Sequence, residues 1–184
     1  MRSSSFVAIL LCALAAPAAA RGPDASASPR IDAKNWRTHP RIVAIRSLVE
    51  ENEGAIKSGR WRPEKRELCS SERRAAGMDA VVVRDGRGRI RKYTTVAGSD
   101  DSAYTIEHQY DGSGRLRFAF ARAGAVNDSE ETYRLYFDEN GAEIWRHASS
   151  RGPGYTFMRP PDFPDAAVVR DPVRDLATPK RCDP

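Results

Sequence analysis

The sequence predicts an α+β fold, with an N-terminal helix packed on a six- or seven-stranded antiparallel β-meander and a Pro-rich tail after it. Three observations lead to this prediction: a recurring turn motif, alternating apolar and polar residues around each copy, and an apolar stripe at helical spacing before them. Seven of the 12 prolines lie from residue 153 onward, and proline is excluded from central strands. The meander is therefore expected to end near residue 150.

The turn motif occurs as Asp85-Gly86-Arg87-Gly88, Asp111-Gly112-Ser113-Gly114 and Asp138-Glu139-Asn140-Gly141, at intervals of 26 and 27 residues. An aspartate at the first position can bond the backbone two residues on, and a glycine at the fourth accepts a left-handed conformation. Four-residue turns offer too few oxygen ligands for a calcium loop. The motif therefore predicts six structural turn residues, namely Asp85, Gly88, Asp111, Gly114, Asp138 and Gly141.

Residues 1–20 have the pattern of a secretory signal peptide. Arg2 and three serines precede an apolar run at 6–16, and Ala18-Ala19-Ala20 supplies small residues for signal peptidase. The run is too short to span a membrane. Leu11 precedes Cys12 where lipoprotein signals have a small residue, so lipidation is not favoured. We expect cleavage near Ala20 and an exported product, periplasmic or extracellular, with no transmembrane span.

The remaining chain divides into three parts. Residues 21–36 lack periodicity and predict a flexible leader. Residues 37–150 are predicted to hold the helix and the meander, with Thr38 as helix cap, Pro40 in the first turn and Gly59 at the end. Residues 151–184 form the Pro-rich tail, expected to be extended and irregular. Its first half is expected to pack on the domain through Tyr155, Phe157, Met158 and Phe163.

Strands are expected near 66–74, 79–84, 89–97, 103–110, 115–122, 131–138 and 142–148. The first is ambiguous, because residues 66–76 also fit a helix. A three-residue turn at Gly114 predicts that Tyr110 faces Leu116, His108 faces Phe118 and Ile106 faces Phe120. That register places the apolar side chains of both strands on one face.

Cys69 and Cys182 are the two cysteines beyond the signal sequence, and in an exported protein they predict a disulfide. The bond would tie the tail to the first strand. It would close a loop of more than a hundred residues. By the chain-entropy model such a loop is worth about 4–5 kcal/mol of stability.

The composition argues against several classes of function. The net charge is +5, but acidic residues interrupt the basic ones, and nucleic-acid binding usually leaves a basic stripe. No phosphate loop, dinucleotide fingerprint or Gly-x-Ser-x-Gly elbow occurs, and His39, His108 and His147 lack metal-ligand spacing. The sequence therefore predicts no nucleic acid, no cofactor, no metal and no assigned catalytic residue.

Arg115 and Arg117, with Glu107 on the neighbouring strand, form the candidate binding face that the sequence suggests. They would contact an acidic polymer or an envelope component; the alternative is a solvated face with loose ion pairs. His108 fits a half-buried, hydrogen-bonded histidine better than a general base. The adjacent Glu107 points to the opposite face of its strand and cannot partner it.

The run Tyr110-Asp111-Gly112-Ser113-Gly114-Arg115-Leu116 resembles the core of YD repeats, the β-hairpin units of large secreted toxin shells. Over residues 66–147 the order of features is similar to small, uncharacterised exported bacterial proteins. In these a helix precedes a meander with Tyr-Asp-x-x-Gly hairpins. The matching pieces are Leu116–Phe120, Tyr133–Phe137 and Gly141–Trp145. The resemblance implies this fold and export from the cell, and it implies no catalytic residue.

The sequence favours an exported non-catalytic protein that acts as a binding or envelope-associated module. The alternative is a small secreted hydrolase of unassigned class. An exposed His108 beside a carboxylate would favour the hydrolase, whereas a filled apolar face would favour the module.

Overall fold

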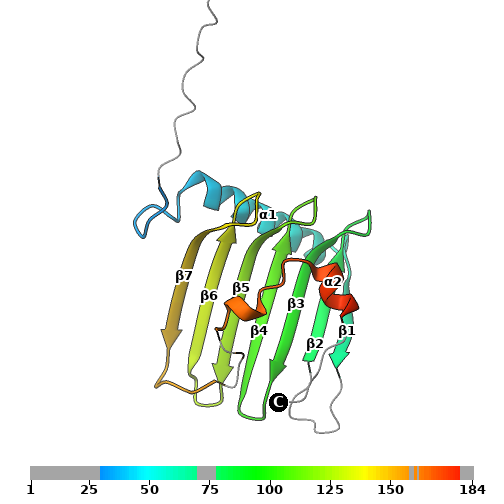
Figure 1. Cartoon of the computed structure of the whole chain (residues 1–184). Helices are drawn as coiled ribbons and strands as arrows, with labels where there is room; N and C mark the ends of the chain where they lie inside the picture. The colour runs from blue at the N-terminus through cyan, green and yellow to red at the C-terminus, as the bar shows by residue number, and fades with distance from the viewer. Residues whose placement is uncertain (1–29, 70–77, 158–159, 161, 179–184) are drawn as a thin grey trace, which may run out of the picture. The chain divides into compact units, whose positions relative to one another are not determined.

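The computed structural model describes residues 30–69, 78–157, 160 and 162–178. In this part of the chain, seven strands form one antiparallel sheet in sequence order (Figure 1). The α+β class and the antiparallel meander are confirmed. The elements are α1 (Pro40–Lys57), β1 (Pro63–Cys69), β2 (Met78–Arg84), β3 (Ile90–Gly98), β4 (Ser102–Tyr110), β5 (Leu116–Ala125), β6 (Glu130–Phe137), β7 (Glu143–Arg151), a 3-10 turn (Asp165–Ala167) and α2 (Pro172–Ala177).

Helix α1 begins one residue later than the predicted cap at Thr38 implies. The N-cap is His39, whose Nδ1 atom accepts a hydrogen bond from the backbone N–H of Arg41 at 3.3 Å. An imidazole nitrogen thus does what a Thr hydroxyl was expected to do. Pro40 occupies the first helical turn, and Gly59 follows the helix with φ of 73°.

One face of α1 packs on the sheet beside the hairpin turns. Ile42 and Ile45 lie in a cluster with Trp36 and Tyr136 at one end, and Ala55 packs with Trp61 and Val83 at the other. Figure 1 shows α1 crossing the strands at their hairpin ends. The helix therefore covers one end of this sheet face.

The opposite face of the sheet carries the main core, and the C-terminal segment covers it (Figure 1). Val168, Val169 and Leu176 pack on one buried cluster of this face, and Phe157 and Phe163 pack on a second. The prediction of an irregular tail is wrong for residues 172–177. Asp171 caps α2 through the backbone N–H groups of Val173 and Arg174, with Pro172 at the first position. Met158 lies outside the described residues.

Each of three hairpins is followed by a β-bulge, which changes the predicted register. Tyr110 faces Leu116 as expected, but the register then shifts by one residue. His108 pairs with Ala119 and Ile106 pairs with Ala121, so their predicted pairing with Phe118 and Phe120 is wrong. Because Arg117 is the extra residue, both phenylalanines point to the face that α1 partly covers. The equivalent extra residues of the other hairpins are Arg91 and Ile144.

The ambiguous segment at 66–76 is a strand as far as it is described, within β1. Residues 70–77 lie outside the described part, as do Cys182 and the side chain of Cys69, so the predicted disulfide stays a prediction. No helix among the described residues is long and apolar enough to cross a membrane.

Candidate functional site

The three turn aspartates share one geometry that occupies their carboxylates. In the second turn, Asp111 Oδ1 accepts the backbone N–H groups of Ser113 at 2.9 Å and Arg115 at 3.1 Å. Burial alone would raise the pKa of Asp111, but these hydrogen bonds and the Ser113 hydroxyl outweigh it and hold the pKa at about 2. Asp85 and Asp138 make the same bonds to the residues two and four positions on. Gly88, Gly114 and Gly141 have φ of 79°, 83° and 80°.

The arginines of the predicted binding face belong to the same turns. Arg115 Nε lies 3.1 Å from Asp111 Oδ2, and Arg117 pairs with Glu139 at 2.9 Å. Glu107 instead pairs with Lys92 at 2.7 Å. Arg115 and Arg117 thus share Asp111, which Arg117 approaches at 3.6 Å, whereas Glu107 belongs to a separate ion pair. The structure brings a different group of arginines together, described below.

His108 is hydrogen-bonded as predicted, but it is fully buried rather than half-buried, because the C-terminal segment packs over it and bonds to it. Its Nδ1 atom lies 3.1 Å from the carbonyl oxygen of Tyr93, and its Nε2 atom accepts the backbone N–H of Val169 at 2.9 Å. An accepting Nε2 requires that the proton sit on Nδ1, so the imidazole is neutral. Burial lowers the pKa of His108 to about 4. Both ring nitrogens are engaged with backbone, which makes His108 a structural group.

Between α1 and the far end of the sheet lies a surface that we call the open face. Cross-strand pairing places its side chains on the same side of the sheet as α1. Cross-strand neighbours form rows that run across the strands, and the open face is the two rows next to the row that α1 covers. None of them is buried, in contrast to the tail-covered face. The open face consists of one row with Val81, Thr94, Glu107, Phe120, Arg134 and His147, and a second row with Asp79, Val96, Thr105, Arg122, Thr132 and Ser149.

Three arginines project from this side of β5, β6 and β7. Arg134 lies over the ring of Phe120, with its guanidinium carbon 5.0 Å from the ring centroid. Arg122 and Arg151 both pair with Glu130, the latter through its Nε atom at 3.2 Å. Hydrogen bonds from Arg151, then from Arg122, hold the pKa of Glu130 below its usual range in spite of partial burial. We call Arg122, Arg134 and Arg151 the arginine group.

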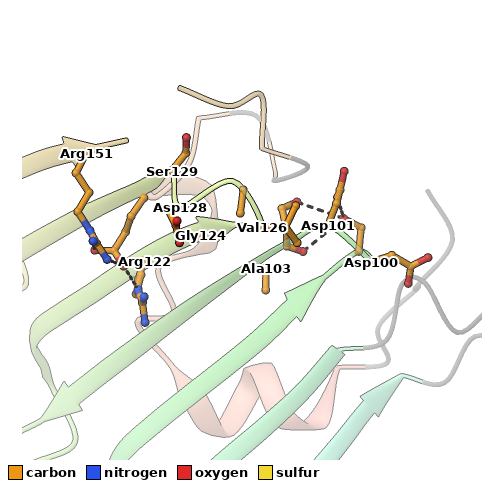
Figure 2. A pocket seen from close by; sticks show the side chains of 13 residues that line it. Asp100, Asp101, Ala103, Arg122, Gly124, Val126, Asp128, Ser129 and Arg151 are labelled. Atoms are coloured by element: carbon orange, nitrogen blue, oxygen red, sulfur yellow. Dashed lines mark hydrogen bonds and ion pairs between the residues drawn. The ribbon is translucent and has the colours of Figure 1, made fainter. Parts of the chain in front are cut away.

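A hollow of about 390 Å³ adjoins the arginine group at the end of the open face. Figure 2 shows Arg122 and Arg151 at one side of it and Asp100 and Asp101 at the other. Its floor includes Gly124, where a Cβ atom would meet nothing within 4 Å. Glu130 and Asp128 also line the hollow and interact with these arginines, so four carboxylates and two guanidiniums surround it.

Sequence reasoning missed the arginine group because its members come from three strands. The one local signal was Phe120 and Arg122 at alternate positions of β5, which share a face in any strand. Among the described residues, no group of three or more His, Cys, Asp or Glu side chains is placed to hold a metal ion.

The arrangement supplies fixed cations beside hydroxyl and aromatic side chains on a partly exposed surface, which is chemistry for holding an anionic molecule. Comparison of the chain with family models, curated proteins and solved structures finds no match.

Proposed function

We propose that this protein is an exported, non-catalytic binding module whose ligand lies on the open face of the sheet. The observation that carries the proposal is the contrast between the two faces. His108, Ile106 and Tyr110 on the tail-covered face are fully buried, whereas Thr94, Thr105 and other members of the open face keep solvent exposure. An exposed sheet face of mixed chemistry beside a completed core is typical of a recognition surface.

Two further observations support a binding role over hydrolysis. His108 is buried and bonded to backbone at both ring nitrogens, which is the opposite of the exposed histidine that hydrolysis would use. The turn aspartates accept backbone N–H groups and hold their own hairpins. Sequence analysis weighed His108 as a general base and the aspartates as calcium ligands, and each of these groups has a structural role instead.

Export is part of the proposal and is supported by the charged, apolar and small-residue order of residues 1–20. In this setting we propose a mature chain that starts near Arg21. The helix braces the hairpin end of the sheet, and a disulfide between Cys69 and Cys182 anchors the tail. Intact-mass analysis of the native product tests this start. A lipid adduct on Cys12 would contradict it.

The binding role is tested by screening purified neutral and acidic glycans, peptides and lipid vesicles against the full mature protein. For any molecule that binds, Thr105→Trp should weaken binding, because the indole would fill the open face between β3 and β5. Thr156→Trp, at an exposed position of the C-terminal segment, is the matched control and should bind like wild type.

The same samples separate the module from the hydrolase. Mass analysis of the bound molecule after long incubation should show it unchanged. Shortened products whose formation survives Thr105→Trp would refute both the non-catalytic role and the open face as the site.

A further inference from the structure

The charge of the open face is concentrated on its β5–β7 half. Arg122 and Arg134 contribute two guanidinium charges there, and Arg151 adds a third from the next row. Glu130, in the same row as Arg151, pairs with Arg122 and Arg151. On the β2–β4 half, Glu107 pairs with Lys92 and Asp79 pairs with Lys65. Asp128 also interacts with Arg151, so three guanidiniums face two carboxylates on the β5–β7 half, an excess of one positive charge. On the β2–β4 half Lys92 pairs with Glu53 of α1 as well, so no positive excess remains there.

Building on the proposed function, we infer that the arginine group binds an acidic glycan, with oxyanion groups of the polymer paired to Arg122, Arg134 and Arg151. The strongest support for this inference comes from Arg134. Its side chain forms no hydrogen bond or ion pair within the described part of the chain, and its guanidinium lies over the ring of Phe120. A cation held in place on an aromatic ring keeps its N–H donors available to an incoming oxyanion.

The two other arginines also keep donor capacity. The side chain of Glu130 is 16% exposed, whereas those of Arg122 and Arg151 are 55% and 69% exposed. The carboxylate therefore lies on the inner side of the pair and orients both guanidiniums, while their outer N–H groups face solvent. Five donors on each guanidinium exceed what one carboxylate can accept.

The spacing of the arginine group favours a polymer over a single small anion. Arg122 and Arg134 occupy adjacent strands one row apart, which places their Cα atoms roughly 8 Å apart. Arg134 and Arg151 are two rows apart, at roughly 14 Å. One carboxylate or sulfate cannot contact all three, whereas a chain with regularly repeated anionic groups can.

The open face lies deeper than the outer surface of α1, which favours a glycan over a membrane surface as the ligand. Helix α1 packs on the row next to Arg134, and a helix with its side chains is about 10 Å thick. A flat bilayer would meet α1 before it reached Arg134 on the sheet. A single polymer chain is narrow enough to lie on the sheet beside the helix. The hydroxyls of Thr132 and Ser149 lie 2.8 Å apart there, next to the arginines, and can bond to sugar hydroxyls.

The hollow limits the direction in which a bound polymer can run. Asp100 and Asp101 form its far side and would repel an anionic polymer that continued toward β3 and β4 (Figure 2). Asp101 is fixed there by the Tyr155 hydroxyl and by Ser99. The polymer is therefore confined to β5–β7.

The test measures binding of the mature protein to polygalacturonate and heparin, which carry carboxylates and sulfates respectively. Neutral dextran and phosphatidylglycerol vesicles are measured beside them. We expect an acidic glycan to bind and salt to weaken it. The triple variant Arg122→Gln, Arg134→Gln, Arg151→Gln should weaken binding about ten-fold or more. The matched control replaces three exposed arginines elsewhere, Arg62→Gln, Arg87→Gln and Arg174→Gln, and should retain most of the affinity.

Equal losses in the two triple variants would overturn the inference, because net charge alone would then explain binding. Binding of vesicles alone, or of no acidic glycan, would overturn it as well. Dextran binding that Thr105→Trp blocks and the arginine triple does not would overturn the inference while leaving the proposed function standing. If the triple variant does not fold, Arg134→Gln alone decides, with melting as its folding check.

Discussion

His108 links the fold to pH, because protonation of its buried ring breaks a hydrogen bond that holds the C-terminal segment. In the neutral ring Nε2 accepts the backbone N–H of Val169, and a protonated Nε2 would be a donor facing that N–H. Burial lowers the pKa from 6.5 to about 4 in the folded protein. Between these values the unfolded chain binds the additional proton, so the free energy of unfolding falls as the pH is lowered.

The magnitude follows from the two pKa values. A difference of about 2.5 units corresponds to roughly 3 kcal/mol of stability lost between pH 7 and pH 4, most of it below pH 6. The turn aspartates contribute in a different window. Their pKa values are lowered from 3.8, so their loss of stability occurs below about pH 4.

Urea denaturation from pH 7 to pH 4.5, followed by tryptophan fluorescence, measures this effect. Wild type should lose stability steadily as the pH falls through 6. His108→Gln, which does not titrate, should be less stable at pH 7 but nearly independent of pH in this range. An equal pH slope in both proteins would refute the assignment of the effect to His108.

Two further predictions concern stability, and a third concerns the disulfide. Gly114→Val should destabilise by about 1–2 kcal/mol, because a β-branched residue resists a φ of 83°; Gly112→Val, without a positive φ, is the control, and equal melting of the two variants would contradict the turn assignment. Asn52→Leu should cost about 3 kcal/mol in urea denaturation, because buried Asn52 joins Arg91, Gln109 and the carbonyl of Tyr110, and a wild-type midpoint would contradict this network. Thiol titration of the unreduced mature protein should find no free cysteine, and reduction should expose residues 170–181 to trypsin; two free thiols would exclude the Cys69–Cys182 bond.

Local turn chemistry explains how much of the fold the sequence predicts. An aspartate followed three residues later by glycine specifies a hairpin almost independently of the rest of the chain, so strand order and approximate strand bounds follow from it. The helix was predicted equally well from its apolar stripe and Pro40. Its cap was not, because a histidine nitrogen substitutes for the expected hydroxyl of Thr38.

The bulges explain why side-chain direction was predicted less well. The register with Phe118 and Phe120 in the core was attractive because their side chains are larger and more apolar than those of Arg117 and Ala119, but an extra residue at Arg117 turns both to the other face. Ala119 and Ala121 face the buried side instead. A signal for the bulge was present in the repeated order Gly-Arg-apolar-Arg after the first two turns, which predicts equivalent backbone in both hairpins.

The candidate site depends on register across three strands, which is why the sequence pointed to Arg115 and Arg117 and missed Arg122, Arg134 and Arg151. The former follow a turn directly and are visible as a local cluster. The latter are separated by up to 29 residues and meet only because β5, β6 and β7 pair as they do.

The most direct test of the open face as the binding site is an NMR titration of the isotope-labelled mature protein with polygalacturonate of defined length. We predict that the largest amide shift changes occur on β5–β7, at Phe120, Arg122, Arg134 and Arg151, and that arginine side-chain resonances move with them. Changes centred on residues 162–178 or on the hairpin turns, with β5–β7 unaffected, would contradict the account.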